Sequence, residues 1–505
     1  MAAESAQLQR LLVDAKAEAR AKACSEITSR TAKAFTDVPP EEAYRAAIAS
    51  LQSFETQYIR NTNPAFRRGG MASVKATIAG VPNTTTSVTK GGKRHNPEFV
   101  KLTADLVLPY LADVDPVVRI SALETAHELV RKFQSQLFTT SFMELFRALH
   151  AVMMDKDKRC QALGRELSST VREFVTGSES DSFSPETFVS FITEAMEPLV
   201  HGSTTAGGVT TNAELMDAQV VQWLLEWLSH VYDLPNHELV LQLPRFLGHL
   251  YHLIARCPSP EAEKIMERSL QDTKRAHVQG LEINIRELMV TSIDCVNTIE
   301  VPATRKLALE WTAELLRLGG LKMLSLTHSL LDAILPQLSA KDLTIRIAAQ
   351  NANMLLQQLL VENESVMLSS ASQSINPPLG GVPASSSPPI HSELAHHTAS
   401  PQGTVATAPS VASSATTATF TQVAYYPVLQ AMMSHLEVRS KEDTRIASLE
   451  WFLLIHGVRP DVVHDHFETM FEAILSTLGD VSENVMHKSV LHVRRRVGEC
   501  HAQIR

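Results

Sequence analysis

Apolar residues along this chain recur at helical spacing. In the stretch LKMLSLTHSLLDAILPQL, one stripe of a helix takes in Leu324, Leu331, Leu335 and Leu338, joined by Ile334, because residues three, four or seven positions apart share a helical face. Similar stripes run through Phe142–Met154, Phe188–Leu199, Val220–Val231, Leu239–Ile254, Ile283–Val296 and Met470–Leu478. No segment shows convincing strand alternation. The pattern predicts an all-α protein of roughly eight to ten helix pairs.

One helix–turn–helix unit occurs twice without gaps. VLPYLADVDPVVRISA begins at Val107 and ILPQLSAKDLTIRIAA begins at Ile334. In each copy a helix ends, an Asp stands in a tight turn, and an Arg follows in the next helix. The matched residues are Asp115 and Asp342, and Arg119 and Arg346. A self-similar helix pair of about 40 residues predicts a HEAT/armadillo-type α-solenoid of stacked antiparallel helix pairs.

Three of the four tryptophans follow the same Leu-Glu pair, at Trp227, Trp311 and Trp451. The last two copies extend into TRKLALEW and TRIASLEW, which contain Arg305 and Arg445. In a helix, Leu shares a face with the Arg four residues before it, while the adjacent Glu turns away. We therefore expect Leu and Trp to pack between stacked helices, and Glu to face solvent.

A low-complexity segment interrupts the helical pattern. Residues 365–419 are rich in Ser, Thr, Ala and Pro, and Glu393 is their one formal charge. Such a segment cannot bury enough apolar surface to offset its ordering entropy. The predicted organisation is a main solenoid over 1–362, a disordered linker over 363–419, and a separately hinged C-terminal repeat pair over 420–505.

Composition narrows the function classes. The formal net charge is −9, which argues against a general nucleic-acid binder because phosphate contacts need an excess of Lys and Arg. The five cysteines are scattered without a C-x-x-C pair, as in reduced cytosolic proteins. No stretch approaches the ~18 apolar residues of a spanning helix, and the N-terminus lacks a signal-peptide core. We expect a cytoplasmic protein.

Enzyme motifs are missing from the sequence. It has no G-x-x-x-x-G-K-[ST], G-x-S-x-G or H-E-x-x-H, so we predict no catalytic residue, no cofactor and no metal. His249 and His252 share a predicted helical face, but no further ligands cluster near them. The turn Asp and helix Arg residues are better explained structurally, since Asp can cap the next helix and Arg can bridge to a neighbouring repeat.

Basic residues gather near the N-terminal end of an otherwise acidic chain. They are Arg67, Arg68, Lys90, Lys93 and Arg94, with Gly69 and Gly70 directly after the first two. One interpretation is a contact with an acidic partner or an anionic membrane surface. The alternative is a solvated loop.

An ordered set of segments resembles one HEAT-repeat family, the Vac-fourteen scaffold of the phosphatidylinositol-3-phosphate 5-kinase (PIKfyve) complex. The matching features are Arg67–Gly70 opening an early helix, then Val107–Val130, Leu163–Val175, Val220–Leu228, Leu241–Ile254, Thr444–His456 and Met470–Val485. Their order and spacing hold across nearly the whole chain.

The resemblance implies a non-catalytic scaffold that joins the PIKfyve-type lipid kinase and an opposing Sac-type phosphoinositide phosphatase on endosome, lysosome or vacuole membranes. Membrane association would be peripheral, through these partners. The resemblance carries over only Arg67, Arg68, Gly69 and Gly70 as contact residues. In that family the phosphatase-binding region follows the repeats, and this chain reaches Arg505 close to its last repeat, so we expect that region to be either absent here or carried elsewhere. Two rivals with the same fold are a transport or coat adaptor and a protein-phosphatase regulatory subunit.

Overall fold

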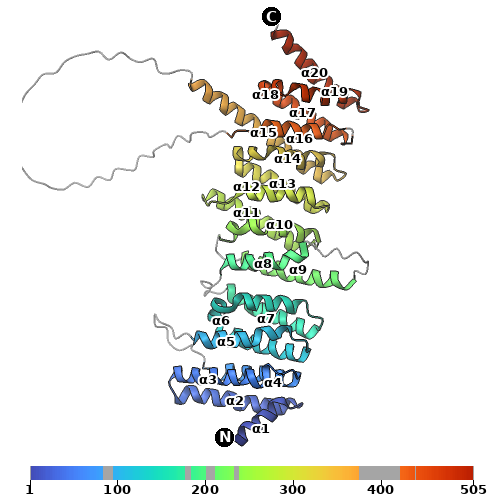
Figure 1. The fold of residues 1–505 in the computed structure, drawn as a ribbon. Helices are drawn as coiled ribbons and strands as arrows, with labels where there is room; N and C mark the ends of the chain where they lie inside the picture. Colours follow the sequence, from blue (N-terminus) through green and yellow to red (C-terminus); the bar gives the residue numbers. More distant parts are fainter. Residues whose placement is uncertain are drawn as a thin grey trace, which may run out of the picture. The chain divides into compact units, whose positions relative to one another are not determined.

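The computed structural model describes residues 2–82, 95–176, 184–200, 211–232, 238–256, 258–374, 421–437 and 439–503. Every regular element in these ranges is helical, which confirms the predicted all-α solenoid. The chain divides into two compact units, Met1–Ala308 and Leu309–Arg505. Figure 1 shows the described helices of each unit lying side by side along the chain order.

The first unit consists of helix pairs in chain order. Its helices are α1 (Ala2–Val13), α2 (Ala17–Asp37), α3 (Pro40–Phe54), α4 (Pro64–Gly80), α5 (Pro97–Val107), α6 (Pro116–Met153), α7 (Lys158–Thr176), α8 (Pro185–Val200), α9 (Thr211–Tyr232), α10 (Glu238–Arg256), α11 (Pro260–Val278) and α12 (Ile285–Thr298). The second helix of one pair stacks on that of the next, as α2 does on α4 and α4 on α6. The first helices stack likewise, as α8 does on α10 and α10 on α12.

The long helix α6 serves two consecutive pairs. Its backbone leaves helical geometry at Gln134 and again at Ser141. The part before the break pairs with α5, and the part after it leads into α7. A break of this kind lets one continuous element supply the second helix of one repeat and the first helix of the next.

The second unit begins inside α13 (Pro302–Gly319). It continues through α14 (Thr327–Ile334), α15 (Leu343–Ser374), α16 (Tyr425–Ser434), α17 (Glu442–Val458), α18 (Pro460–Asp465), α19 (Phe467–Ser476) and α20 (Glu483–Gln503). Short 3-10 turns precede α14 and α15 and follow α19. Within this unit α14 packs on α16, and α17 packs on both α15 and α20.

Helix α15 extends into the segment predicted to be disordered. It runs to Ser374, and Val366 and Met367 are both partly buried. Asn363 and Glu364 are almost fully buried and engaged in hydrogen bonds, which accounts for a helix that persists past residue 363. The rest of the predicted linker, residues 375–419, lies outside the described residues.

Residues after the predicted linker pack directly against α15. The Asn363 side chain donates to the Thr421 carbonyl at 3.0 Å and accepts from the Thr421 N–H at 2.9 Å. The Tyr425 hydroxyl donates to Glu364 at 2.5 Å. The C-terminal helices therefore share a compact unit with the helices before the linker, and the observed division at Ala308 differs from the predicted boundaries at 362 and 420.

Candidate interaction surface

The turns between paired helices carry an Asp that caps the second helix. Asp115 Oδ1 accepts from the N–H groups of Val117 at 2.8 Å and Val118 at 3.3 Å, at the start of α6. Asp342 Oδ1 accepts from the N–H and the hydroxyl of Thr344, at 2.7 and 2.8 Å, at the start of α15. The Thr344 hydrogen bonds hold the pKa of Asp342 below its usual value. Both residues thus stabilise helix starts.

An arginine in the second helix ties its own turn to the turn of the next repeat. Arg119 Nη1 donates to the carbonyls of Asp113 and Val114 at 2.8 and 3.0 Å. Its Nε and Nη2 donate to the Asp155 carboxylate at 2.6 and 2.9 Å. We call this arrangement an arginine rung. The planar guanidinium suits it because one edge can bind two carboxylate oxygens together.

The arginine rung recurs in both units. Arg67 donates to the Asp113 carboxylate at 2.8 and 2.9 Å, and Arg445 pairs with Asp480 at 2.7 Å. Arg305 and Arg346 instead have hydrogen bonds to carbonyls of their own turns, Ile299 and Ala340, and no carboxylate partner among the described residues.

The rung carboxylates are functional residues that the sequence reading missed. Asp113 and Asp155 each stand two positions before a capping Asp, and Asp480 stands two before Ser482. Each also accepts a backbone N–H from that following position. The Asp-x-Asp spacing in 113–115 and 155–157 is the available signal, because the first Asp of each turn binds a rung arginine or its own turn and the second caps the next helix.

The three matched tryptophans are fully buried. Trp227, Trp311 and Trp451 are each 0% exposed, and the Leu residues two positions before them are buried too. Glu226 and Glu310 are exposed. Trp451 Nε1, in α17, donates to Asn353 Oδ1 of the neighbouring helix α15 at 2.7 Å. The Leu-Glu-Trp repeat thus places large side chains in the core between stacked helices.

Ser168 accepts two buried hydrogen bonds in the core of the first unit. Its Oγ accepts from Trp223 Nε1 at 2.8 Å and from Trp227 Nε1 at 2.9 Å. Ser168 is 1% exposed. Both indoles also pack against Phe146, with ring centroids 5.2 and 4.6 Å away. One hydroxyl on α7 therefore satisfies two buried donors on α9.

Replacing Ser168 by Ala is expected to lower the free energy of unfolding of the first unit by about 2–4 kcal/mol, because two buried indole N–H groups lose their acceptor. Urea unfolding followed by circular dichroism would measure this loss. S169A is the matched control, since Ser169 is partly exposed and should change stability by less than about 0.5 kcal/mol. Equal effects of the two variants would contradict the assigned role of Ser168.

The segment Arg67–Gly70 is placed in the packing of α4. Gly69 and Gly70 are buried, and a Cβ on them would lie 2.7 Å from the Leu12 carbonyl oxygen and from Ile59 Cγ1, respectively. Arg67 is 15% exposed within its rung. Arg68 Nη2 reaches the Asp14 carbonyl at 3.4 Å. The glycines allow close approach of α4 to its neighbours, and contact of this segment with a partner stays a prediction.

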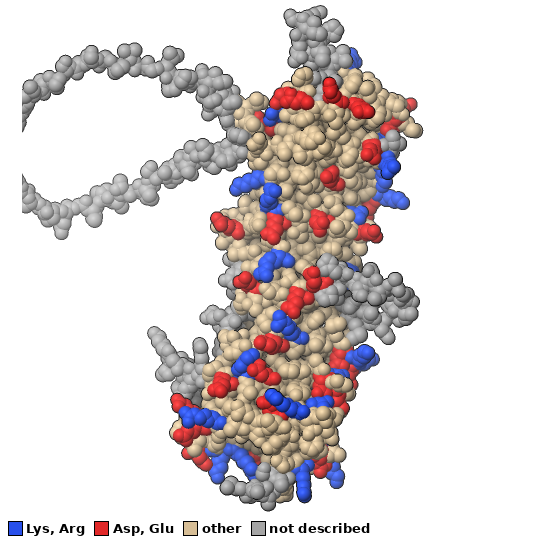
Figure 2. All heavy atoms as spheres, viewed as in Figure 1, with Lys and Arg blue, Asp and Glu red and all other residues tan. Residues whose placement is uncertain are grey.

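The other predicted contact residues cannot be placed. Lys90, Lys93 and Arg94 lie outside the described residues. On the face drawn in Figure 2, Lys and Arg side chains are interspersed with Asp and Glu side chains. Ion pairs join neighbouring helices of the first unit, such as Lys101 of α5 with Glu144 of α6 at 3.5 Å and Arg147 of α6 with Glu194 of α8 at 3.0 Å. Exposed pairs of this kind contribute little stability.

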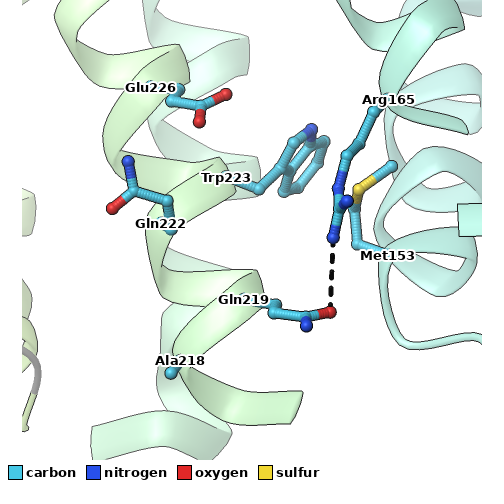
Figure 3. Close-up of a pocket in the computed structure, with 7 residues that line it drawn as sticks. All are labelled: Met153, Arg165, Ala218, Gln219, Gln222, Trp223 and Glu226. Carbon is cyan, nitrogen blue, oxygen red and sulfur yellow. Dashed lines mark hydrogen bonds between the residues drawn. The ribbon is translucent and has the colours of Figure 1, made fainter. Parts of the chain in front are cut away.

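A cleft of about 440 Å³ lies beside α9 in the first unit. It is lined by Met153, Arg165, Ala218, Gln219, Gln222, Trp223 and Glu226. Figure 3 shows the Arg165 side chain alongside the Trp223 ring, with its hydrogen bond to Gln219. The lining offers one cation, one carboxylate and two amides, without a nucleophile next to a base. Such a cleft can recognise a side chain of a partner.

Within the described ranges, no group of three or more His, Cys, Asp or Glu residues could hold a metal ion. His249, considered as a metal ligand from the sequence, lies with Nε2 3.1 Å from Glu197 Oε2. None of the described helices is long and apolar enough to cross a membrane.

No protein-family model matches the chain. A curated relative, the protein VAC14 homolog of Arabidopsis thaliana, is 24% identical over 309 residues. The match covers 61% of this chain and 37% of the relative, so the chain spans well under two thirds of the relative's length.

Among solved structures, a Kap121p mutant aligns over 95% of this chain and 41% of its own, with a TM-score of 0.34 and 11% identity. Importin beta aligns over 94% of this chain and 57% of its own, with a TM-score of 0.27 and 12% identity. Both similarities are low.

Proposed function

We propose that this chain, a divergent VAC14-like protein, is a non-catalytic scaffold or regulatory subunit of the lipid kinase complex that synthesises phosphatidylinositol 3,5-bisphosphate. The observation that carries the proposal is the sequence match to the VAC14 homolog. The stacked helix pairs support it, because a solenoid offers an extended surface for partners.

Scaffolding needs contact points held at fixed separations. Within each unit, the ion pairs of the arginine rungs and the packing of the buried tryptophans stabilise the contact between successive helix pairs. Partners bound to such a unit meet at a raised effective concentration without any new contact between them. The cleft beside α9 adds polar and charged groups that a partner side chain could contact.

The kinase partner is of the PIKfyve type, and a Sac-type phosphatase is a second partner. The chain associates with endosomal, lysosomal or vacuolar membrane from the cytoplasmic side, through these proteins.

Affinity purification of the tagged chain from its own cells, with mass spectrometry of bound proteins, tests the proposal. Recovery of a FYVE-type lipid kinase is the expected result, and recovery of a Sac-type phosphatase would add the second partner. W451F, which keeps most of the core volume, should recover the same proteins. Nuclear cargo, coat subunits or a protein-phosphatase catalytic subunit in place of the kinase would contradict the proposed function and leave the fold standing.

A further inference from the structure

The first arginine rung has no carboxylate. Arg20, in α2, donates from Nη1 to the carbonyls of Asp14 and Ala15, both at 2.7 Å. Arg67 and Arg119 make the same pair of bonds from Nη1 to their own turns. In each case the first of the two carbonyls belongs to the residue six positions earlier. Arg20 therefore makes the same hydrogen bonds to its own turn as the arginines of the complete rungs.

The other edge of the Arg20 guanidinium lacks an acceptor. In Arg67 and Arg119, Nε and Nη2 donate to a carboxylate of the next turn. For Arg20, neither Nε nor Nη2 has a hydrogen-bond partner among the described residues. The side chain is only partly exposed, and its orientation is set by the two carbonyl bonds. The Nε and Nη2 donors on this edge of the Arg20 guanidinium are therefore not bound to a carboxylate of the described residues.

The reason lies at Asn61, the position in the next turn that corresponds to Asp113 and Asp155. Asn61 Oδ1 accepts from the Asn63 N–H at 2.9 Å, just as Asp113 Oδ1 accepts from the Asp115 N–H at 2.8 Å. The remaining polar group of Asn61 is an NH2, which is a donor. It cannot accept from Arg20, whereas the second oxygen of an Asp could.

A second arginine, Arg68, shares a carbonyl acceptor with Arg20. Arg68 Nη2 donates to the same Asp14 carbonyl as Arg20, at 3.4 Å. Its Nε is buried and has no acceptor in the described part of the chain. Burial, followed by the charge of Arg20, lowers the pKa of Arg68, while Asp115 acts in the opposite direction. The Asp14 carboxylate is used to accept the Lys16 N–H at 2.8 Å.

We infer that Arg20 and Arg68 form a binding site for the carboxylate of an acidic peptide segment on a partner protein. The ligand chemistry follows from the other rungs, where the same guanidinium edge binds an aspartate through two hydrogen bonds. A carboxylate entering here completes the rung in trans and relieves the repulsion between two neighbouring cations. The site is independent of the proposed kinase scaffold, since it rests on the rung geometry alone.

Binding of a fluorescein-labelled peptide, GDDGDDG, to the full chain tests the site by fluorescence anisotropy at low salt. We expect the matched peptide GNNGNNG to bind at least about tenfold more weakly, as loss of charge-assisted hydrogen bonds implies. R20Q should weaken GDDGDDG binding by about tenfold as well. We expect Gln to be tolerated at position 20, because Gln161 already makes the equivalent hydrogen bond in another turn. Its Nε2 donates at 2.6 Å to the carbonyl of Asp155, the residue six positions earlier.

N61D supplies the missing carboxylate within the chain. It should reduce GDDGDDG binding by about tenfold and raise the melting temperature by a few degrees, about 2–4 °C. N63D is the charge-matched control, because Asn63 caps α4 through the Ala65 N–H and Asp serves as a cap at Asp115. It should change binding by less than about twofold.

Three results would overturn the inference. One is equal binding of the acidic and neutral peptides. Another is GDDGDDG binding that R20Q and N61D leave intact. The third is displacement of the peptide by inorganic phosphate far more readily than by acetate, which would assign the arginine pair to phosphate rather than carboxylate.

Discussion

Replacing Trp451 by Ala is expected to lower the free energy of unfolding of the second unit by about 3–5 kcal/mol, the range for removing a buried indole. The side chain is 0% exposed in α17, and its Nε1 donates to Asn353 of α15. Hydrogen–deuterium exchange should show the loss in α15 and α17. Helices of the first unit should keep their protection, because repeats interact with their neighbours only.

W451F separates packing from hydrogen bonding in this test. Phe fills most of the indole volume but cannot donate to Asn353, so it should cost about 1–2 kcal/mol. In the affinity purification, W451A should lose the lipid kinase and W451F should retain it. Stability of W451A within about 0.5 kcal/mol of the parent chain would show that Trp451 does not support the core.

Replacing Asp113 by Ala is expected to cost about 3–5 kcal/mol in the first unit, because it leaves a mostly buried guanidinium without its counter-charge. The Arg67 and Asp113 side chains are 15% and 8% exposed. Asp113 also accepts the Asp115 N–H at 2.8 Å, so the substitution removes a backbone acceptor as well. Urea unfolding of the full chain, with exchange mapping of α4 and α6, measures the effect.

D105A provides the matched control for D113A. Asp105 pairs with Lys101 at 3.0 Å, but their side chains are 53% and 41% exposed, so its loss should cost less than about 1 kcal/mol. The double variant R67Q/D113A should cost less than the sum of the two single changes, because the unpaired charge is gone. Strict additivity, or a D113A effect as small as that of D105A, would contradict the rung.

Much of the fold could be predicted because its determinants are local. Apolar stripes at helical spacing identify the helices, and a capping Asp acts on N–H groups two and three residues later. The Leu-Glu-Trp repeat likewise identified side chains that the structure buries at 0% exposure. Each of these features depends on residues within one or two helical turns, so the linear order of amino acids contains it.

The candidate site was less predictable, because its contacts join residues far apart in the chain. Arg67 was read as a surface contact, yet its partner Asp113 lies 46 residues later. Ser168 gave no sequence signal, although it accepts from two indoles 55 and 59 residues away. Helix α15 was expected to stop before residue 363, but contacts with Thr421 and Tyr425 accompany its continuation.

The amino-acid sequence by itself determined an all-α chain of capped helix pairs with tryptophans in its core. The tertiary structure decided which charges are paired. A guanidinium gains a partner only where stacking brings the next turn's carboxylate to its edge, as at Asp113 and Asp155, and Asn61 leaves Arg20 without one. That outcome depends on the register between stacked helices, which packing sets and no local pattern encodes.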